Sequence, residues 1–145
     1  MGDQMEKPEL YHPDILALAQ NPPRWRKEHV AQYCIKAYNA VCGDKFEIRL
    51  DIDEVITDAS FFGYGCVVSK ASTALLVDLL VGLNADDAGR MIRTYLDQIH
   101  NGKTKVNSDS RFVPFMIARK YPGRVQCAVL AWETLLQSGL DPGST

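Results

Sequence analysis

Three cysteines in this chain lie at turns or near helix starts, where thiols are often reactive, and an aspartate follows one of them closely. Cys66 follows the glycine turn Gly63-Tyr64-Gly65 and opens an apolar-periodic segment that indicates a helix. A helix N-terminus favours a thiolate, because the peptide dipoles direct positive charge toward it. Cys42 lies in the turn-like sequence Val41-Cys42-Gly43-Asp44, and Cys127 lies near the start of the last apolar-periodic segment. These residues predict one site for a metal or for sulfur chemistry.

The expected topology brings these residues together although no Cys-x-x-Cys pair is present. In an antiparallel meander, the start of the second strand and the end of the third lie at one end of the sheet, which places Cys42, Asp44 and Cys66 there. A last helix packed across that end adds Cys127. Three thiolates and one carboxylate suit zinc, and thiolates also hold an iron–sulfur unit. The alternative is that all three cysteines are small buried core residues.

Other reactive side chains give weaker signals. Arg124 precedes Cys127 by three residues on nearly the same helical face, where it lowers a thiol pKa or holds a persulfide anion; the alternative is a solvated arginine. Cys34 lies in the middle of an expected strand and is interpreted as structural or inert. A Cys–His hydrolase is not indicated, since three histidines share no pattern with a thiol: His12, His29 and His100.

The elements that must position the site follow from hydrophobic periodicity. Residues 45–53 alternate apolar and polar side chains with period two, which predicts a half-buried strand, and two further strands are expected at 30–38 and 55–62. Helices are expected at 13–20, from Cys66 to Gly82, from Asn84 to Asn101, at 114–120 and at 123–138. The prediction is an α+β fold, a three-stranded antiparallel sheet with helices packed on one face. One domain is expected over 10–138, with a disordered N-terminus at 1–9 and a frayed end at 139–145.

Composition limits the classes of partner. The chain has 145 residues, 46% of them hydrophobic, and a net charge of −2, which argues against nucleic acid. No apolar run reaches membrane-spanning length, so no membrane partner is expected and the cytoplasm is the predicted location. The short basic patch Arg24-Trp25-Arg26-Lys27 is compatible with RNA or an acidic partner, but is better interpreted as a linker with one tryptophan tucked against the domain.

Several motifs together resemble a known family. They are Ala37-Tyr38-Asn39-Ala40-Val41-Cys42-Gly43-Asp44, the run from Ile56 to Cys66 followed by Ser69-Lys70-Ala71-Ser72, and Arg124-Val125-Gln126-Cys127. In this order they closely resemble the U-type iron–sulfur assembly proteins, which include IscU, the N-terminal part of NifU, and SufU. The long segment between Cys66 and Cys127, and Gln126 where IscU-like proteins carry histidine, resemble the SufU branch.

The resemblance implies a role in iron–sulfur cluster assembly beside a PLP-dependent, SufS-like cysteine desulfurase. It implies that Cys42, Asp44, Cys66 and Cys127 bind zinc and that Cys42 accepts sulfur as a persulfide, a sulfurtransferase-type activity with Arg124 as support. A downstream cluster scaffold is a further implied partner. One alternative is a non-enzymatic scaffold that builds a [2Fe–2S] cluster on Cys42, Cys66 and Cys127. The other is a binding module with a structural zinc and no transfer chemistry.

Overall fold

The computed structural model describes residues 12–102 and 109–139. Its sheet contains β1 (Tyr33–Asn39), β2 (Asp44–Ile52) and β3 (Ile56–Tyr64), paired antiparallel in the order β1-β2-β3. The helices of the described ranges are α2 (Pro13–Gln20), α3 (Val67–Leu80), α4 (Ala85–Asn101), the 3-10 helix η1 (Ser110–Lys120) and α5 (Pro122–Gln137). The predicted α+β fold is confirmed. The disorder expected at 1–9 and the fraying expected beyond residue 139 fall outside the described residues.

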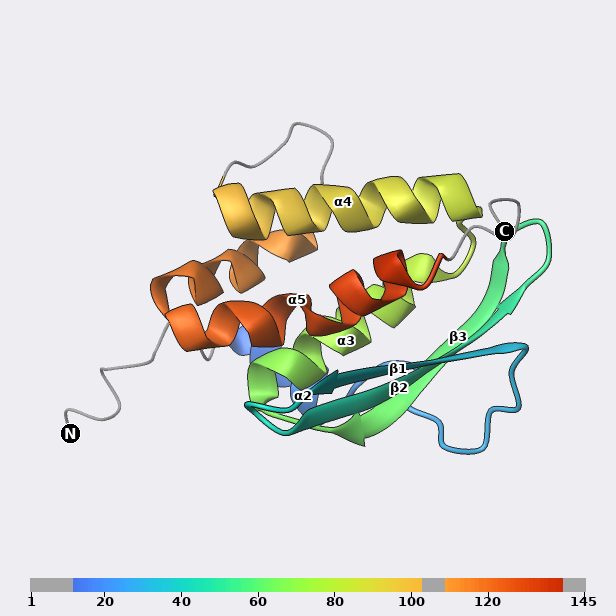
Figure 1. Ribbon diagram of the computed structural model, residues 1–145, viewed down its shortest axis with the longest axis horizontal. Helices are drawn as coiled ribbons and strands as arrows, with labels where there is room; N and C mark the ends of the chain where they lie inside the picture. The colour runs from blue at the N-terminus through green and yellow to red at the C-terminus, as the bar shows by residue number, and fades with distance from the viewer. Residues whose placement is uncertain (1–11, 103–108, 140–145) are drawn as a thin grey trace.

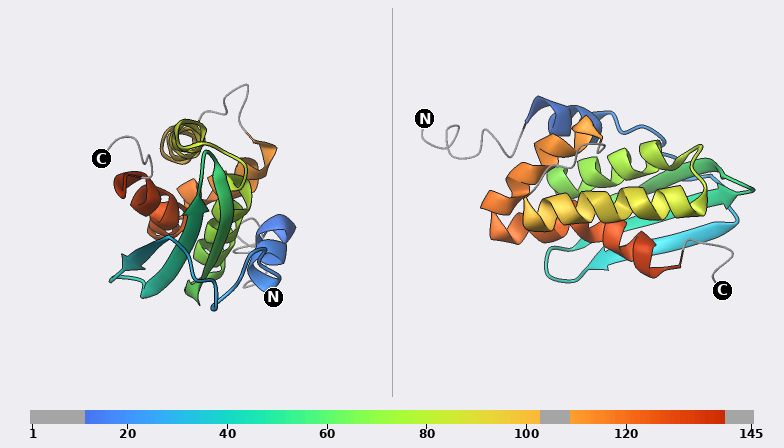
Figure 2. Two further views of the ribbon diagram at one scale, coloured as in Figure 1. Left: turned by 90° about the vertical axis from the view of Figure 1, so that its right-hand side faces the viewer. Right: turned by 90° about the horizontal axis from the view of Figure 1, so that it is seen from above.

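The elements form successive layers (Figures 1 and 2). Helices α3 and α5 cover one face of the sheet, and α4 lies on the side of these two helices away from the sheet, which it does not contact closely. Helix α2 packs beside α3. None of the helices in the described ranges has the length and apolar character needed to span a membrane.

Alternation along β2 separates the two faces of the sheet. Phe46, Ile48 and Leu50 are buried against the helices, whereas the odd-numbered residues from Lys45 to Asp51 lie on the opposite, outer face. This matches the predicted period of two. The outer face is not bare, because the connection between α2 and β1 crosses part of it.

That connection explains the main error in the predicted boundaries. The first strand begins at Tyr33 rather than at residue 30. The residues just before it bond to side chains instead of joining the ladder: the Gln32 amide donates to Asp51, and the Gln32 side chain accepts from the Ile52 amide. Likewise η1 begins at Ser110, four residues before the predicted start, because Asp109 caps it.

A buried hydrogen-bond cluster joins α3, α4 and α5. Tyr95 stacks on Trp132 with ring centroids 3.6 Å apart. The Tyr95 and Ser72 hydroxyls both donate to the Ala128 carbonyl at 2.6 Å, and Trp132 Nε1 donates to the Ser72 hydroxyl at 2.8 Å. Buried polar groups of this kind specify one packing, since each lost partner carries a desolvation cost. The cluster therefore fixes α5 against α3 one residue from Cys127.

Replacing Tyr95 by Phe removes one donor of this cluster and keeps the ring stacked on Trp132. We expect the free energy of unfolding to fall by about 1 kcal/mol, because a buried hydrogen bond is lost without a cavity. Urea denaturation measures it, with Tyr38→Phe as the control at an exposed tyrosine. Equal stability of the two variants would contradict this role for the Tyr95 hydroxyl.

Candidate metal centre

Cys42 lies at the tip of the hairpin that joins β1 to β2. The turn is built by Asn39, whose carbonyl accepts from the Gly43 amide at 2.7 Å and whose side chain accepts from the Val41 amide at 3.0 Å. Gly43 has a φ of 76°, in the left-handed region that glycine adopts without strain. Cys42 itself is exposed, so its thiol is accessible from outside the domain.

Asp44 is the first residue of β2 and points to the same side as Phe46, toward the helices. Only 1% of its surface is exposed. Its Oδ1 accepts the Cys66 amide at 3.0 Å, while Oδ2 is buried with no hydrogen-bond partner among the described residues. A buried carboxylate oxygen without a partner is unfavourable, and a bound cation removes that cost. This unpartnered oxygen is what fits the site to a metal.

The structure brings three of the four predicted ligands close together. The ligand atoms of Cys42, Asp44 and Cys127 all lie within 4.8 Å of one another, and the two sulfurs are 4.0 Å apart. Cys66 stands outside that set of three, although its thiol interacts with Cys127. The Cys66 sulfur caps α3, where it accepts the Ser69 amide at 3.3 Å. The predicted convergence at one sheet end is thus present, and metal binding by the four residues remains a prediction.

The electrostatics of the centre separate two thiols. The Cys127 thiol donates a hydrogen bond to Cys66, and this bond lowers the pKa of Cys66 to about 6. The Ser69 amide and the Arg124 charge act in the same direction, whereas partial burial of Cys66 acts in the opposite one. The buried Cys127 thiol donates this hydrogen bond to the Cys66 thiolate, and the bond raises the pKa of Cys127 well above its usual range. Arg124 lowers the pKa of Cys66, whereas the cysteine nearest to it in sequence is Cys127.

The remaining sequence candidates lie elsewhere. Cys34 is exposed on the outer face, where partial burial and the neighbouring Glu47 raise its pKa, so it is not activated as a thiolate. Trp25 is half-buried and packs edge-on against Phe61 at 5.2 Å, as the tucked-tryptophan interpretation predicted. His100 lies 3.4 Å from Glu133, away from the thiols.

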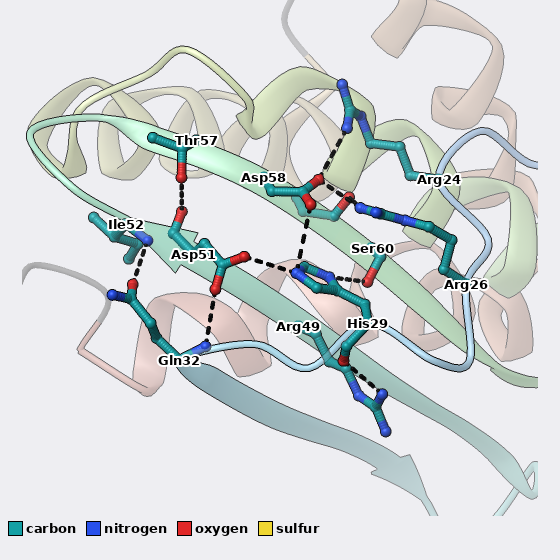
Figure 3. Close-up of polar contacts among 11 residues, drawn as sticks. Arg24, Arg26, His29, Gln32, Arg49, Asp51, Ile52, Thr57, Asp58 and Ser60 are labelled. Atoms are coloured by element: carbon teal, nitrogen blue, oxygen red, sulfur yellow. Dashed lines mark hydrogen bonds and ion pairs between the residues drawn. The ribbon is translucent and has the colours of Figure 1, made fainter.

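Sequence reasoning missed a polar cluster on the outer face (Figure 3). His29 lies between Asp51 and Ser60, at 2.8 and 2.6 Å, and its Nε2 is 3.5 Å from Asp58. One signal was available: Asp51 and Asp58 are direct cross-strand partners on the outer face. Two like charges at such positions repel, so a basic partner from another segment is required, and Arg26 supplies it by donating to Asp58.

Comparison with known proteins identifies the family. A family profile described as the NifU-like N-terminal domain matches residues 10–128. The chain belongs to the NifU-like N-terminal domain family. The NifU-like domain is 31% identical over 131 residues to the iron–sulfur cluster assembly scaffold protein IscU of Thermotoga maritima, covering 89% of this chain and 92% of that protein. It is 27% identical over 99 residues to the zinc-dependent sulfurtransferase SufU of Bacillus subtilis, covering 67% of each.

Solved structures agree with this assignment. The SufU protein of Fervidobacterium islandicum superposes on the NifU-like domain with a TM-score of 0.82 at 26% identity, covering 92% of this chain and 96% of that one. The N-terminal part of a NifU-like protein from Brucella abortus has a TM-score of 0.74 at 22% identity and shares the fold.

Gly65 gives a direct test of the Asp44 position. A Cβ at Gly65 would lie 2.6 Å from Asp44 Oδ1 and 2.9 Å from the Phe46 ring. We expect Gly65→Ala to displace the carboxylate and to weaken zinc binding about tenfold to a hundredfold, as loss of a supporting contact does. A chelator competition titration measures the affinity. The control is Gly123→Ala, where a Cβ meets nothing within 4 Å in the first turn of the helix that carries Cys127; equal affinities of both variants would refute this role.

Proposed function

We propose that this NifU-like domain works in iron–sulfur cluster assembly as a zinc-dependent acceptor of sulfur from a PLP-dependent cysteine desulfurase. The observation that carries the proposal is the contrast within the centre: Cys42 is exposed on a turn, whereas Asp44 and Cys127 are buried beside it. One thiol is therefore accessible to a partner while the others stay in the domain. The similarity to the zinc-dependent sulfurtransferase SufU supports the same assignment.

The residues that would hold zinc are Cys42, Asp44, Cys66 and Cys127. Three thiolates and one carboxylate form a donor set that zinc accepts, and Asp44 has an oxygen available for it. Bound zinc would keep the thiols deprotonated and protected from oxidation. All four cysteines are free, as expected for a reducing compartment, and we place the reaction in the cytoplasm.

The transfer itself is a thiol exchange at the Cys42 sulfur. The Cys42 thiolate attacks the outer sulfur of the persulfide on the donor cysteine, and a new S–S bond forms at Cys42. The old S–S bond breaks, and its electron pair leaves with the inner sulfur as the donor thiolate. Arg124 stabilises anionic sulfur at the centre, consistent with its effect on Cys66.

Replacing Cys42 by Ala tests the acceptor. We expect the variant to fold and to acquire no sulfur from the desulfurase, because the thiols left in the centre are partly or fully buried. Mass spectrometry of persulfidated protein and the rate of alanine release measure the two effects. Cys34→Ala is the matched control and should behave as wild type, since Cys34 is exposed but lies on the other face of the sheet. Undiminished sulfur transfer to Cys42→Ala would end the proposal.

The second candidate is a scaffold that assembles a [2Fe–2S] cluster on Cys42, Cys66 and Cys127 and passes it on. The similarity to the Thermotoga scaffold, which spans more of the chain than that to SufU, favours it. In that case replacing Asp44 by Ala would slow cluster release and stabilise the bound cluster.

Metal analysis of the purified protein separates the two candidates. We expect about one equivalent of zinc and no visible absorption, since three thiolates and a carboxylate make one zinc site. Removal of the zinc by a chelator should lower the unfolding temperature, because the buried Asp44 charge then loses its counter-ion. A brown protein with visible bands would instead support the scaffold.

A further inference from the structure

A pocket lies on the outer face of the sheet, on the side away from the candidate metal centre. Its volume is about 450 Å³. Three lysines line it, Lys27, Lys36 and Lys45, together with four aromatic residues, Trp25, Phe46, Phe62 and Tyr64. A cavity with an apolar lining and several cations at its rim matches an anionic group that also carries an apolar part.

The charge of the pocket is only partly neutralised within the domain, where Glu47 interacts electrostatically with its cross-strand partner Lys36. Among residues 12–102 and 109–139, no ion pair joins any of the three lysines to a carboxylate. The acidic residue that lines the pocket is Glu47, and Arg49 binds it through two nitrogens at 3.0 and 2.6 Å. The pocket is therefore positively charged, although the whole chain has a net charge of −2.

One wall of the pocket is held rigid by the polar cluster of Figure 3. We call residues 24–32 the strap; it crosses the outer face and contributes Trp25 and Lys27. Its backbone is fixed by two bonds to β3 at Phe61 and by Arg49, which donates to the carbonyls of Lys27 and His29 at 2.8 Å. His29, whose side chain is 6% exposed, adds contacts to Asp51 and Ser60. This wall of the pocket is thus fixed in position.

The pocket and the candidate metal centre share one end of the sheet. Lys45 follows Asp44 directly and pairs with both Tyr38 and Tyr64 across the outer face. Both tyrosines are exposed, by 62% and 66%, and Val41 beside Cys42 is exposed by 94%. Apolar side chains clustered at an exposed tip are typical of a protein interface. A partner that reaches Cys42 at this tip therefore also reaches the pocket.

We propose that the three-lysine pocket receives an acidic, apolar-bearing surface segment of the protein that exchanges sulfur at Cys42. The proposal rests on the proposed function for the identity of that partner, the cysteine desulfurase. Carboxylates of the segment pair with Lys27, Lys36 and Lys45, and an apolar side chain packs against Trp25 and Phe62. Such pairs accelerate docking and set its orientation, so the partner's reactive cysteine is presented to the tip.

Charge reversal tests the pocket without touching the centre. The double variant Lys27→Glu and Lys36→Glu is compared with Arg90→Glu and Arg93→Glu, an equal charge change on α4, the layer farthest from the sheet. Calorimetry of each zinc-loaded protein with the desulfurase of the same organism gives Kd at several salt concentrations. We expect Kd to rise at least about tenfold for the lysine variant, with a weaker salt dependence, and to stay unchanged for the control. Equal zinc content and equal unfolding temperature verify folding.

Zero-length carbodiimide cross-linking of the wild-type complex identifies the contacts. We expect Lys27, Lys36 or Lys45 joined to an Asp or Glu of the desulfurase. If the lysine variant binds like wild type while Cys42 still acquires sulfur, the pocket proposal is overturned and the proposed function stands. If wild type binds through the pocket but Cys42 acquires no sulfur, the proposed function fails and the docking surface stands. If wild type binds no desulfurase, both fail.

Discussion

The hydrogen bond from the Cys66 amide to Asp44 joins the first residue of β2 to the N-cap of α3, and the geometry of the centre depends on it. Gly65 allows it, since a side chain there would occupy the space of the carboxylate. The bond holds Asp44 in a buried position where its second oxygen has no partner among the described residues. Burying a charge in this way is costly unless a cation compensates it, so a metal ion bound at this point would stabilise the fold.

The helical core supplies the second constraint. Ser72 and Tyr95 both bond to the Ala128 carbonyl, which sets the position of α5 relative to α3 and hence of Cys127 relative to Cys66. Cys66 and Cys127 are therefore positioned by packed helices, and Asp44 by a strand. Cys42 alone of the four sits on a turn. A centre with three fixed groups and one on a turn is suited to exchange at that one group, because movement there disturbs little of the core.

Local patterns predicted much of this. The structure confirms the strand predicted from the alternation along β2 and the helix predicted from Asn84 to Asn101. The meander topology also predicted that Cys42 and Asp44 meet the later thiols. The start of β1 and the role of His29 could not be predicted, because both depend on how the strap crosses the sheet, a long-range arrangement without local periodicity. Nor does sequence show that the Cys66 sulfur caps its own helix.

Alternation in β2 also explains why the candidate metal centre and the lysine-lined pocket lie so close together. Asp44 and Lys45 are consecutive, yet one side chain enters the helical side and the other the outer face. A shift of one residue in register would exchange the two faces. Gly63, the cross-strand partner of Phe46, opposes such a shift. Its φ is 145°, and a Cβ added there would lie only 2.1 Å from the Lys45 carbonyl oxygen, so only glycine fits at this position. The register that places a carboxylate at the centre thereby also places a lysine in the pocket, and neither face can change without the other.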